Sequence, residues 1–383
     1  MPDIVIVGAG AAGVAAAYEL TKKGVKPLII ERDAIGAHAS GFAFGGLNPF
    51  SGHGIPGPVY PVAQEGMRLH AQLARELHEA TGVDTQYRQA EVLSLAADGD
   101  ERARLMALLP WLKAEGFPAE WLDMRDVLRA EPRLAPGLLG ALRIGGAAEV
   151  DSYRYCLALA QAAEKGGATA RHGEVTGLRF DKGRIAAVEM GREAVPCDKL
   201  LLAAGPWTSA FGKWLGMDIP VRPLKGQIVR LRLKGKPLNA YFGWRGNYAV
   251  TKPDGLVWAG TTEEEAGFDE RPTPEARDRI LTTLATIFPP LMEAEIVHQT
   301  ACLRPLSADG LPIVGPVPGK EGVFVATGAG RKGILLSPAM GRAAADLMLT
   351  GAQAAWLPPL LPARFAKSGA ATQAAKPAAP LLD

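Results

Sequence analysis

The sequence lacks the features that would tie it to a membrane, a disulfide framework, a metal or nucleic acid. Three cysteines in 383 residues, Cys156, Cys197 and Cys302, are too widely spaced for a disulfide framework. No apolar run approaches the roughly 20 residues that a membrane helix needs. Six histidines show no metal-ligand spacing. A net charge of +2 with scattered basic residues gives no continuous basic face for nucleic acid.

The composition instead favours a globular protein. Apolar residues make up 48% of the chain, enough to bury one large core or two ordinary ones. The first expected strand begins within a few residues of Met1, which leaves no room for a signal peptide. We therefore predict a cytoplasmic location.

A glycine-rich turn near the N-terminus predicts a dinucleotide site. Residues 3–7 read as a buried strand, and Gly8, Gly10 and Gly13 follow it at GxGxxG spacing. Gly8 permits the tight turn and Gly10 lets the backbone approach a pyrophosphate. Gly13 lets the following helix lie close to the strand, and the N-terminus of that helix supplies amide donors to the anion.

The order of elements after the turn strengthens this reading. A helix is expected to about Lys23, Gly24 is placed to end it, and residues 26–31 read as the second strand. Glu31 ends that strand, where an acid accepts hydrogen bonds from a ribose 2′-hydroxyl. The alternative is a glycine-rich turn in another doubly wound fold.

The next segment decides between FAD and NAD. An NAD domain normally continues with a helix and a strand, whereas residues 36–58 form one long glycine-rich loop. Long loops inside compact proteins are usually functional or disordered, and Phe42, Phe44, Leu47 and Phe50 argue against disorder. We interpret the loop as the wall of an isoalloxazine pocket.

Two later segments repeat this pattern. Residues 200–203 read as a buried strand that ends in a turn, Gly205-Pro206-Trp207, at the edge where such sheets bind ligands. Residues 322–349 read as strand, glycine loop and helix, with Gly328 and Gly330 in the loop. A helix N-terminus near Gly333 and Ile334 would stabilise the negative charge of a reduced flavin. The alternative is an ordinary strand-to-helix turn.

The intervening segments differ in character. Residues 64–148 are predicted to be mostly helical, and residues 221–263 read as a series of strands. Together they would form a second, interleaved domain over the flavin. After about Leu360 the chain is rich in alanine and proline, and we expect it to fray.

Five motifs in order make the chain resemble a known family. They are "VGAGAAG", "LLLAAGPW", "PLKGQIVRL", "LRPLSADGLPIVG" and "ATGAGRKGILLSPAMG", and they extend over essentially the whole sequence. The chain resembles the FAD-dependent D-amino acid oxidase (DAO) superfamily, and within it glycine oxidase, D-amino acid dehydrogenase and sarcosine oxidase. The resemblance implies an α/β fold with a Rossmann-like FAD-binding domain (GR2-type) built from discontinuous segments, interleaved with an antiparallel-sheet substrate domain.

The resemblance also implies a division of the chain and a set of cofactor positions. The FAD-binding domain would comprise residues 1–63, 149–217 and 302–352, the substrate-binding domain residues 64–148 and 218–301, and the flexible tail residues 361–383. The implied FAD-binding positions are Gly8, Gly10, Ala11, Ala12, Gly13, Glu31, Arg32, Ser40, Gly45, Val175, Gly205, Trp207, Cys302, Gly330, Lys332, Gly333 and Ile334.

Three further positions are implied for catalysis. Arg304 matches the family arginine that grips the substrate carboxylate, and a guanidinium fork suits that task. Tyr248 matches the assisting tyrosine, although Thr251 stands where relatives often have proline. Arg331 would face either substrate or flavin. The plainer alternatives are a structural ion pair for Arg304, a sheet aromatic for Tyr248 and a loop cap for Arg331.

Three positions depart from the glycine oxidase or sarcosine oxidase pattern. Cys302 stands where sarcosine oxidase-like enzymes bond covalently to flavin, although a buried free cysteine is more often a small hydrophobe. Glu263 replaces an apolar residue at the pocket edge, where it would admit a basic or amine-bearing substrate or lie in solvent. Trp258 stands about where sarcosine oxidase has its oxygen-activating lysine.

The leading hypothesis is an FAD-dependent enzyme that oxidises glycine, sarcosine or a small D- or N-substituted amino acid. Its electron acceptor would be oxygen or a membrane or partner carrier, and a homo- or hetero-oligomeric state is left open. One alternative is the flavin subunit of a hetero-oligomeric amino acid or opine dehydrogenase. Another is oxidation of a 2-hydroxy acid or of a tRNA side chain, and the weak net charge counts against tRNA.

Overall fold

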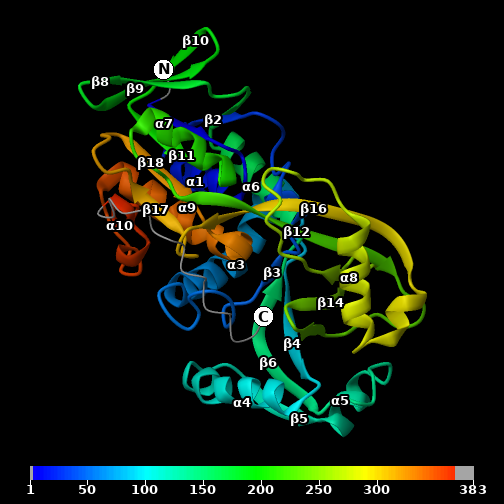
Figure 1. Cartoon of the computed structure of the whole chain (residues 1–383). Helices are drawn as coiled ribbons and strands as arrows, with labels where there is room; N and C mark the ends of the chain where they lie inside the picture. Colours follow the sequence, from blue (N-terminus) through cyan, green and yellow to red (C-terminus); the bar gives the residue numbers. More distant parts are fainter. Residues whose placement is uncertain (1–2, 367–383) are drawn as a thin grey trace.

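Short strands from distant parts of the chain form a six-stranded sheet in one lobe of the molecule (Figure 1). The computed structural model describes residues 3–366. Five strands run parallel and β17 pairs antiparallel with β18 at one edge. In spatial order the strands are β17 (Ile313–Pro316), β18 (Val323–Thr327), β11 (Lys199–Leu202), β1 (Ile4–Val7), β2 (Leu28–Glu31) and β7 (Thr169–His172). The apolar run of β1 is buried along its whole length, as expected for a central parallel strand.

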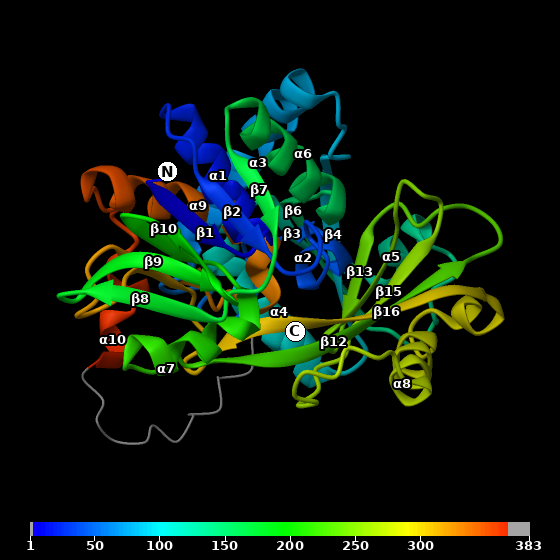
Figure 2. The ribbon, with the colours of Figure 1, turned by 90° about the horizontal axis from the view of Figure 1, so that it is seen from above.

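Helices cover one face of this sheet and a small sheet covers the other. The helical side holds α1 (Ala11–Lys22), α3 (Tyr60–Thr81), α6 (Ser152–Lys165) and α9 (Gly333–Thr350). In Figure 2, α1, α3 and α6 lie on one side of the parallel strands and the small sheet lies on the other. The small antiparallel sheet contains β8 (Gly177–Asp181), β9 (Arg184–Met190) and β10 (Glu193–Pro196).

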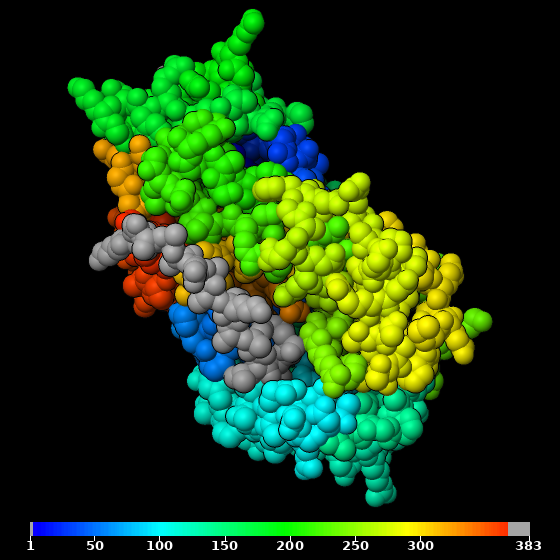
Figure 3. Space-filling view, viewed as in Figure 1, coloured from blue at the N-terminus to red at the C-terminus, as the bar shows by residue number. Residues whose placement is uncertain are grey.

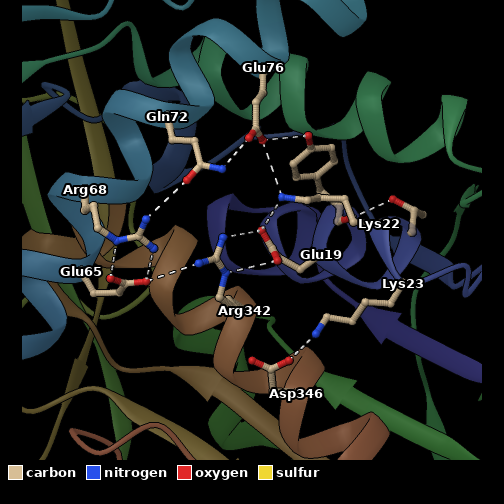
Figure 4. A network of polar contacts seen from close by, with 11 residues as sticks. Glu19, Lys22, Lys23, Glu65, Arg68, Gln72, Glu76, Arg342 and Asp346 are labelled. Carbon is tan, nitrogen blue, oxygen red and sulfur yellow. Dashed lines mark hydrogen bonds and ion pairs between the residues drawn. The ribbon is translucent and has the colours of Figure 1, made fainter.

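An ion-pair network joins three of the helices (Figure 4). Arg342 on α9 lies between two carboxylates, with Nε 3.3 Å from Glu19 on α1 and Nη1 3.4 Å from Glu65 on α3. Lys22 on α1 reaches Glu76 on α3 at 3.6 Å. The side chain of Glu19 is only 8% exposed, so its pairing with Arg342 satisfies a charge that burial would otherwise disfavour.

A nine-stranded sheet forms the second lobe. Its pairs are antiparallel except for the parallel pair of β13 and β4. In spatial order the strands are β16 (Glu295–Ser307), β12 (Val221–Arg232), β15 (Val257–Gly260), β14 (Asn247–Thr251), β13 (Tyr241–Trp244), β4 (Arg88–Ala96), β6 (Gly140–Glu149) and β3 (Gly46–Leu47), with β5 (Ala119–Asp123) also paired to β6.

The remaining helical elements of the described residues are α-helices and short 3-10 turns. They are α2 (Ala39–Phe42), α4 (Gly99–Ala114), α5 (Met124–Ala130), α7 (Gly212–Leu215), α8 (Pro274–Ala285) and α10 (Ala363–Ala366), with 3-10 turns η1 (Gly205–Phe211), η2 (Pro289–Glu293), η3 (Gly330–Lys332) and η4 (Pro358–Leu360). Within residues 3–366 no helix is both long and apolar enough to cross a bilayer.

The predicted α/β architecture is confirmed, and one segment is more mixed than expected. Residues 64–148 were expected to be mostly helical; they hold α4, α5 and most of α3, but they also contribute β4, β5 and nearly all of β6 to the large sheet. Pairing with partners distant in sequence decides the conformation of these strands. The strands predicted within residues 221–263 are confirmed.

The division into domains remains a proposal. β16 runs through the expected boundary at residue 302, and β3, inside the glycine-rich loop, pairs with β6 of the large sheet. The expected fraying of the tail falls mostly on residues 367–383, which lie outside the described residues.

The packing of α9 on α1 depends on Gly341. A methyl carbon at this position would lie 2.6 Å from the backbone nitrogen of Ala16, so one helix would have to move. We expect Gly341→Ala to lower the free energy of unfolding by about 1–3 kcal/mol in urea titrations, because overpacking strains a filled core. Gly99→Ala is the matched control, since it begins a helix with no atom within 4 Å of its added carbon. Equal stability of the two variants would contradict this account.

Candidate functional site

A cavity of about 880 Å³ lies between the carboxyl ends of the parallel strands and the large sheet. This volume is in the upper part of the usual range for ligand sites, about 300–1,000 Å³. All the predicted site residues line it except Gly13, which packs behind the turn. The lining members of that set are Gly8, Gly10, Ala11, Ala12, Glu31, Arg32, Ser40, Gly45, Val175, Gly205, Trp207, Tyr248, Cys302, Arg304, Gly330, Arg331, Lys332, Gly333 and Ile334.

The glycine-rich turn lets backbone groups border the cavity. Gly8 has φ +105°, and a methyl carbon there would lie 2.5 Å from the carbonyl oxygen of Ala203. A methyl carbon on Gly13 would lie 2.0 Å from the carbonyl oxygen of Gly8. Both positions therefore require glycine, and α1 begins directly after Gly10 with its amide groups facing the cavity edge.

Two polar side chains hold this turn. A carboxylate oxygen of Glu31 accepts a hydrogen bond from the amide of Ala9 at 2.7 Å, and the hydroxyl of Ser40 accepts one from the amide of Ala11 at 3.0 Å. Each carboxylate oxygen has two acceptor sites. Glu31 thus positions the loop and retains capacity to accept from a ribose hydroxyl.

A loop of the second lobe, residues 261–273, contacts the first lobe beside the cavity. In the space-filling view, the yellow surface of the second lobe meets the green surface of the first (Figure 3). His38 connects Asp33 at 2.8 Å with Glu270 of this loop at 3.0 Å. Burial lowers the pKa of His38, but its two carboxylate partners outweigh burial and leave that pKa raised. The ring centroids of Trp207 and Phe268, which belongs to the same loop, lie 5.5 Å apart. The guanidinium carbon of Arg32 lies 5.0 Å from the ring centroid of Trp207.

The N-terminus of α9 is held by His70, which the sequence did not indicate, and by Lys332, which was expected to bind FAD. His70 on α3 donates from Nε2 to the carbonyl oxygen of Ile334 at 2.8 Å. Complete burial lowers the pKa of His70 to about 4, so the imidazole is neutral near pH 7. Lys332 donates to the carbonyl oxygen of Asn48 at 3.0 Å and thereby connects η3 to the glycine-rich loop.

Arg304 is placed by its strand and by the segment after β15. Its guanidinium donates to the hydroxyl of Thr261 at 2.7 Å and to the carbonyl oxygen of Thr262 at 3.1 Å. The side chain is 11% exposed. Gly226, on the neighbouring strand β12, leaves room for it, because a methyl carbon there would lie 2.0 Å from Nη2. Nothing in the local sequence around Gly226 indicated this contact.

Aromatic rings form the wall of the cavity beside Arg304. The ring of Tyr248 lies 4.2 Å from Phe44 and 5.5 Å from Tyr241, measured between ring centroids. Among residues 3–366 no hydrogen-bond partner for the Tyr248 hydroxyl is present, although the residue lines the cavity. Burial raises the pKa of this phenol, so it stays protonated and able to donate. Trp258 lies outside the lining residues, with Arg230 3.9 Å above its ring.

Glu263 lies between the two arginines. Its Oε1 is 3.8 Å from Nη1 of Arg304 and 3.7 Å from Nη1 of Arg331. Arg331 also donates to the carbonyl oxygen of Gly246 at 3.5 Å. Glu263 therefore lines the cavity and also pairs with Arg304 and Arg331, which the sequence did not indicate.

The three cysteines are free and buried. Cys302 alone lines the cavity, and burial raises the pKa of its thiol despite the opposing charge of Arg304. A raised pKa disfavours the thiolate that a covalent link would need. Within the described residues there is no group of three or more His, Cys, Asp or Glu side chains that could hold a metal ion.

The arrangement therefore fits a dinucleotide with a flat ring. Glycine turns and helix N-termini border one part of the cavity, and they suit a pyrophosphate. Two guanidinium groups and a phenol meet at the other part, and they suit a small carboxylate.

Comparisons with known proteins agree with this geometry. The family model DAO, described as FAD dependent oxidoreductase, matches residues 3–347. Glycine oxidase of Pseudomonas putida is 30% identical over 378 residues, which cover 96% of this chain and 98% of that protein. The crystal structure of glycine oxidase from Geobacillus kaustophilus superposes with a TM-score of 0.89 at 32% identity, covering 94% of this chain and 97% of that one. Iminodiacetate oxidase from Chelativorans sp. BNC1 has a TM-score of 0.86 at 27% identity, covering 94% and 98%.

The close approach of Gly226 to Arg304 gives a test of the guanidinium's position. Gly226→Ala should displace the flexible guanidinium rather than the backbone, so we expect FAD to be retained and affinity for acetate to fall at least about tenfold. The measurement is the change in flavin absorbance during acetate titration. Gly243→Ala is the control, because its added carbon would come no closer than 3.9 Å to other atoms. Unchanged acetate affinity in Gly226→Ala would remove Arg304 from the ligand site.

The buried His70 predicts acid sensitivity. Its pKa is about 4 in the folded chain, against about 6.5 when exposed. The unfolded chain therefore binds more protons between these values, and stability present above pH 6.5 is lost as pH falls toward 4, by up to about 3 kcal/mol. We expect His70→Gln, which keeps an amide donor, to flatten this pH dependence in urea unfolding. His78→Gln, on the same helix, should keep the slope of the parent protein, and an equally steep slope in His70→Gln would contradict the assignment.

Proposed function

The chain belongs to the DAO family of FAD-dependent oxidoreductases, and from this premise we propose that it oxidises the C–N bond of a small amino acid to an imine. The observation that carries the proposal is the placement of Arg304. Its guanidinium borders the cavity with two protein acceptors already bonded, and its remaining N–H groups are available to a carboxylate.

Tyr248 supports the same assignment. Its phenol stays protonated, so the hydroxyl can donate a hydrogen bond. Tyr248 lies in the cavity wall next to Arg304, and its hydroxyl has no hydrogen-bond partner among residues 3–366. A substrate carboxylate would accept from both side chains. We propose that Arg331 adds positive charge at the same end of the cavity and that its role there is secondary to Arg304.

The rings of Phe44 and Tyr241 border this end and limit the space for a side chain on the substrate. Glycine, sarcosine and small D- or N-substituted amino acids are therefore the proposed substrates. The relatives that are glycine oxidases and an iminodiacetate oxidase support this class.

The chain's own residues contribute mainly by positioning. Arg304 and Tyr248 hold the carboxylate, and the aromatic wall excludes water from the Cα hydrogen. FAD, when bound, supplies the acceptor for the hydride that leaves Cα. The amine nitrogen forms the C=N bond and loses a proton, and water then hydrolyses the imine to the 2-oxo acid. The N-terminus of α9 and Lys332 would favour negative charge on the reduced cofactor.

The proposed FAD-binding residues are those of the glycine turns, Glu31, Arg32, Ser40, Val175, Trp207 and the segment 330–334. Cys302 belongs to the same wall, and we propose that it holds FAD without a covalent bond. The electrons then pass to oxygen or to a partner carrier, and rapid reoxidation in air distinguishes the first acceptor from the second.

The visible spectrum of the purified protein tests this function. We expect a flavin band that glycine, sarcosine or another small amino acid bleaches without oxygen, and yellow colour that leaves the protein on acid precipitation. Colour retained in the pellet would instead assign a covalent role to Cys302. Bleaching by 2-hydroxy acids but not by any amine would overturn the substrate class.

Variants test the carboxylate anchor. Arg304→Lys should raise KM about 10- to 100-fold, because a hydrogen bond to a charged group contributes about 1.5–3 kcal/mol and lysine lacks the planar fork. Tyr248→Phe should have the same direction with a smaller effect. Arg222→Lys, an exposed arginine paired with Glu265, is the control and should leave KM unchanged. An unchanged KM in Arg304→Lys would exclude the proposed anchor.

A further inference from the structure

The charges at the substrate end of the cavity are arranged unusually. Arg304 and Arg331 both approach the same oxygen of Glu263, at 3.8 and 3.7 Å. A carboxylate of the protein thus already lies between the two cationic groups expected to bind the carboxylate of a ligand. Glu263 is itself one of the lining residues, so its charge faces the ligand as well as the arginines.

The backbone on both sides of Glu263 is anchored. The carbonyl oxygen of Thr262 accepts from Arg304 at 3.1 Å. Glu264 forms a two-way backbone bridge with Lys225, with both N···O distances 3.0 Å. The Cα of Glu263 is therefore held at the cavity edge.

The side chain of Glu263 can nevertheless change its conformation. It is 48% exposed and is paired at distances longer than a hydrogen bond, so it can shift to admit a ligand without leaving the arginines. Arg304 keeps its two bonds to Thr261 and Thr262 during such a shift, because neither involves the Glu263 side chain.

We propose that Glu263 is a specificity-determining residue that selects substrates with one carboxylate and disfavours those with two. This inference rests on the proposed function. Glu263 offsets one of the positive charges that Arg304 and Arg331 bring to this end of the cavity, and a single ligand carboxylate can still pair with Arg304. A second carboxylate would meet the charge of Glu263, and like charges placed side by side at a binding site are strongly unfavourable.

The charge pattern at this end of the cavity differs from that expected of a site that binds dicarboxylates. Two arginines alone would suit a ligand such as iminodiacetate, the substrate named for one solved relative. Glu263 removes one unit of that positive charge within 4.0 Å of both guanidinium groups. The proposed substrate is therefore a neutral or N-alkylated monocarboxylic amino acid.

Acetate and malonate provide the test, because they differ by one carboxylate and neither is an amine. Both are titrated into the FAD-loaded enzyme, and binding is followed by the change in flavin absorbance rather than by turnover. We expect the parent protein to bind acetate more tightly than malonate. Glu263→Gln should raise the affinity for malonate relative to acetate at least about tenfold, since the amide keeps the size and removes the charge.

Glu265→Gln is the matched control. Glu265 is two residues away, 64% exposed and paired with Arg222, and it does not line the cavity. It should leave the ratio of the two affinities unchanged. Flavin content of each variant shows that it is folded.

Three results would overturn the inference. If Glu263→Gln leaves the malonate-to-acetate ratio unchanged, Glu263 does not select by carboxylate number, even when Arg304→Lys still weakens acetate binding. If the ratio is unchanged and Glu263→Gln instead weakens the binding of glycine, Glu263 acts on the amine. Absence of any response to acetate in the parent protein would reject the carboxylate site itself, and the selectivity would fall with it.

Discussion

The antiparallel ladder between β12 and β16 is the constraint on which the site depends. Its first pair is Val221 with Ser307 and its last is Arg232 with Glu295. The two strands extend from the large sheet to the lobe that holds the parallel strands (Figure 1). Cys302 and Arg304 lie on one strand of this ladder, and Gly226 lies opposite Cys302 on the other. The register therefore decides both where the guanidinium stands and which residue leaves room for it.

Charged side chains at the cavity form ion pairs between the two lobes. Glu263 lies between Arg304 and Arg331, and His38 joins Asp33 to Glu270 on the same loop, residues 261–273. His70 has the opposite character, because it is fully buried and kept neutral while it holds the first turn of α9. The first two arrangements depend on charge, and the third depends on the exclusion of charge.

The dinucleotide turn could be predicted from the sequence because its determinants are local. Gly8, Gly10 and Gly13 follow one strand at a fixed spacing, and the closest contact of Gly13 is with the carbonyl oxygen of Gly8, although Gly8 itself also packs against Ala203. The strands within residues 64–148 could not be predicted, for the opposite reason. Strands β4, β5 and β6 are stabilised by partners across the sheet, which no local period records.

For the proposed catalytic positions, the sequence supplied the residue types through ordered motifs but not their contacts. The pairing of Glu263 with two arginines, the space at Gly226 and the bond from His70 to Ile334 join residues tens to hundreds of positions apart.

The sequence alone determined the parallel FAD-binding sheet and the glycine cradle, because the short-range sterics of glycine and the burial of apolar strands act within a few residues. The tertiary structure decided the shape and charge of the substrate end, because hydrogen bonds and ion pairs between strands depend on distance in space.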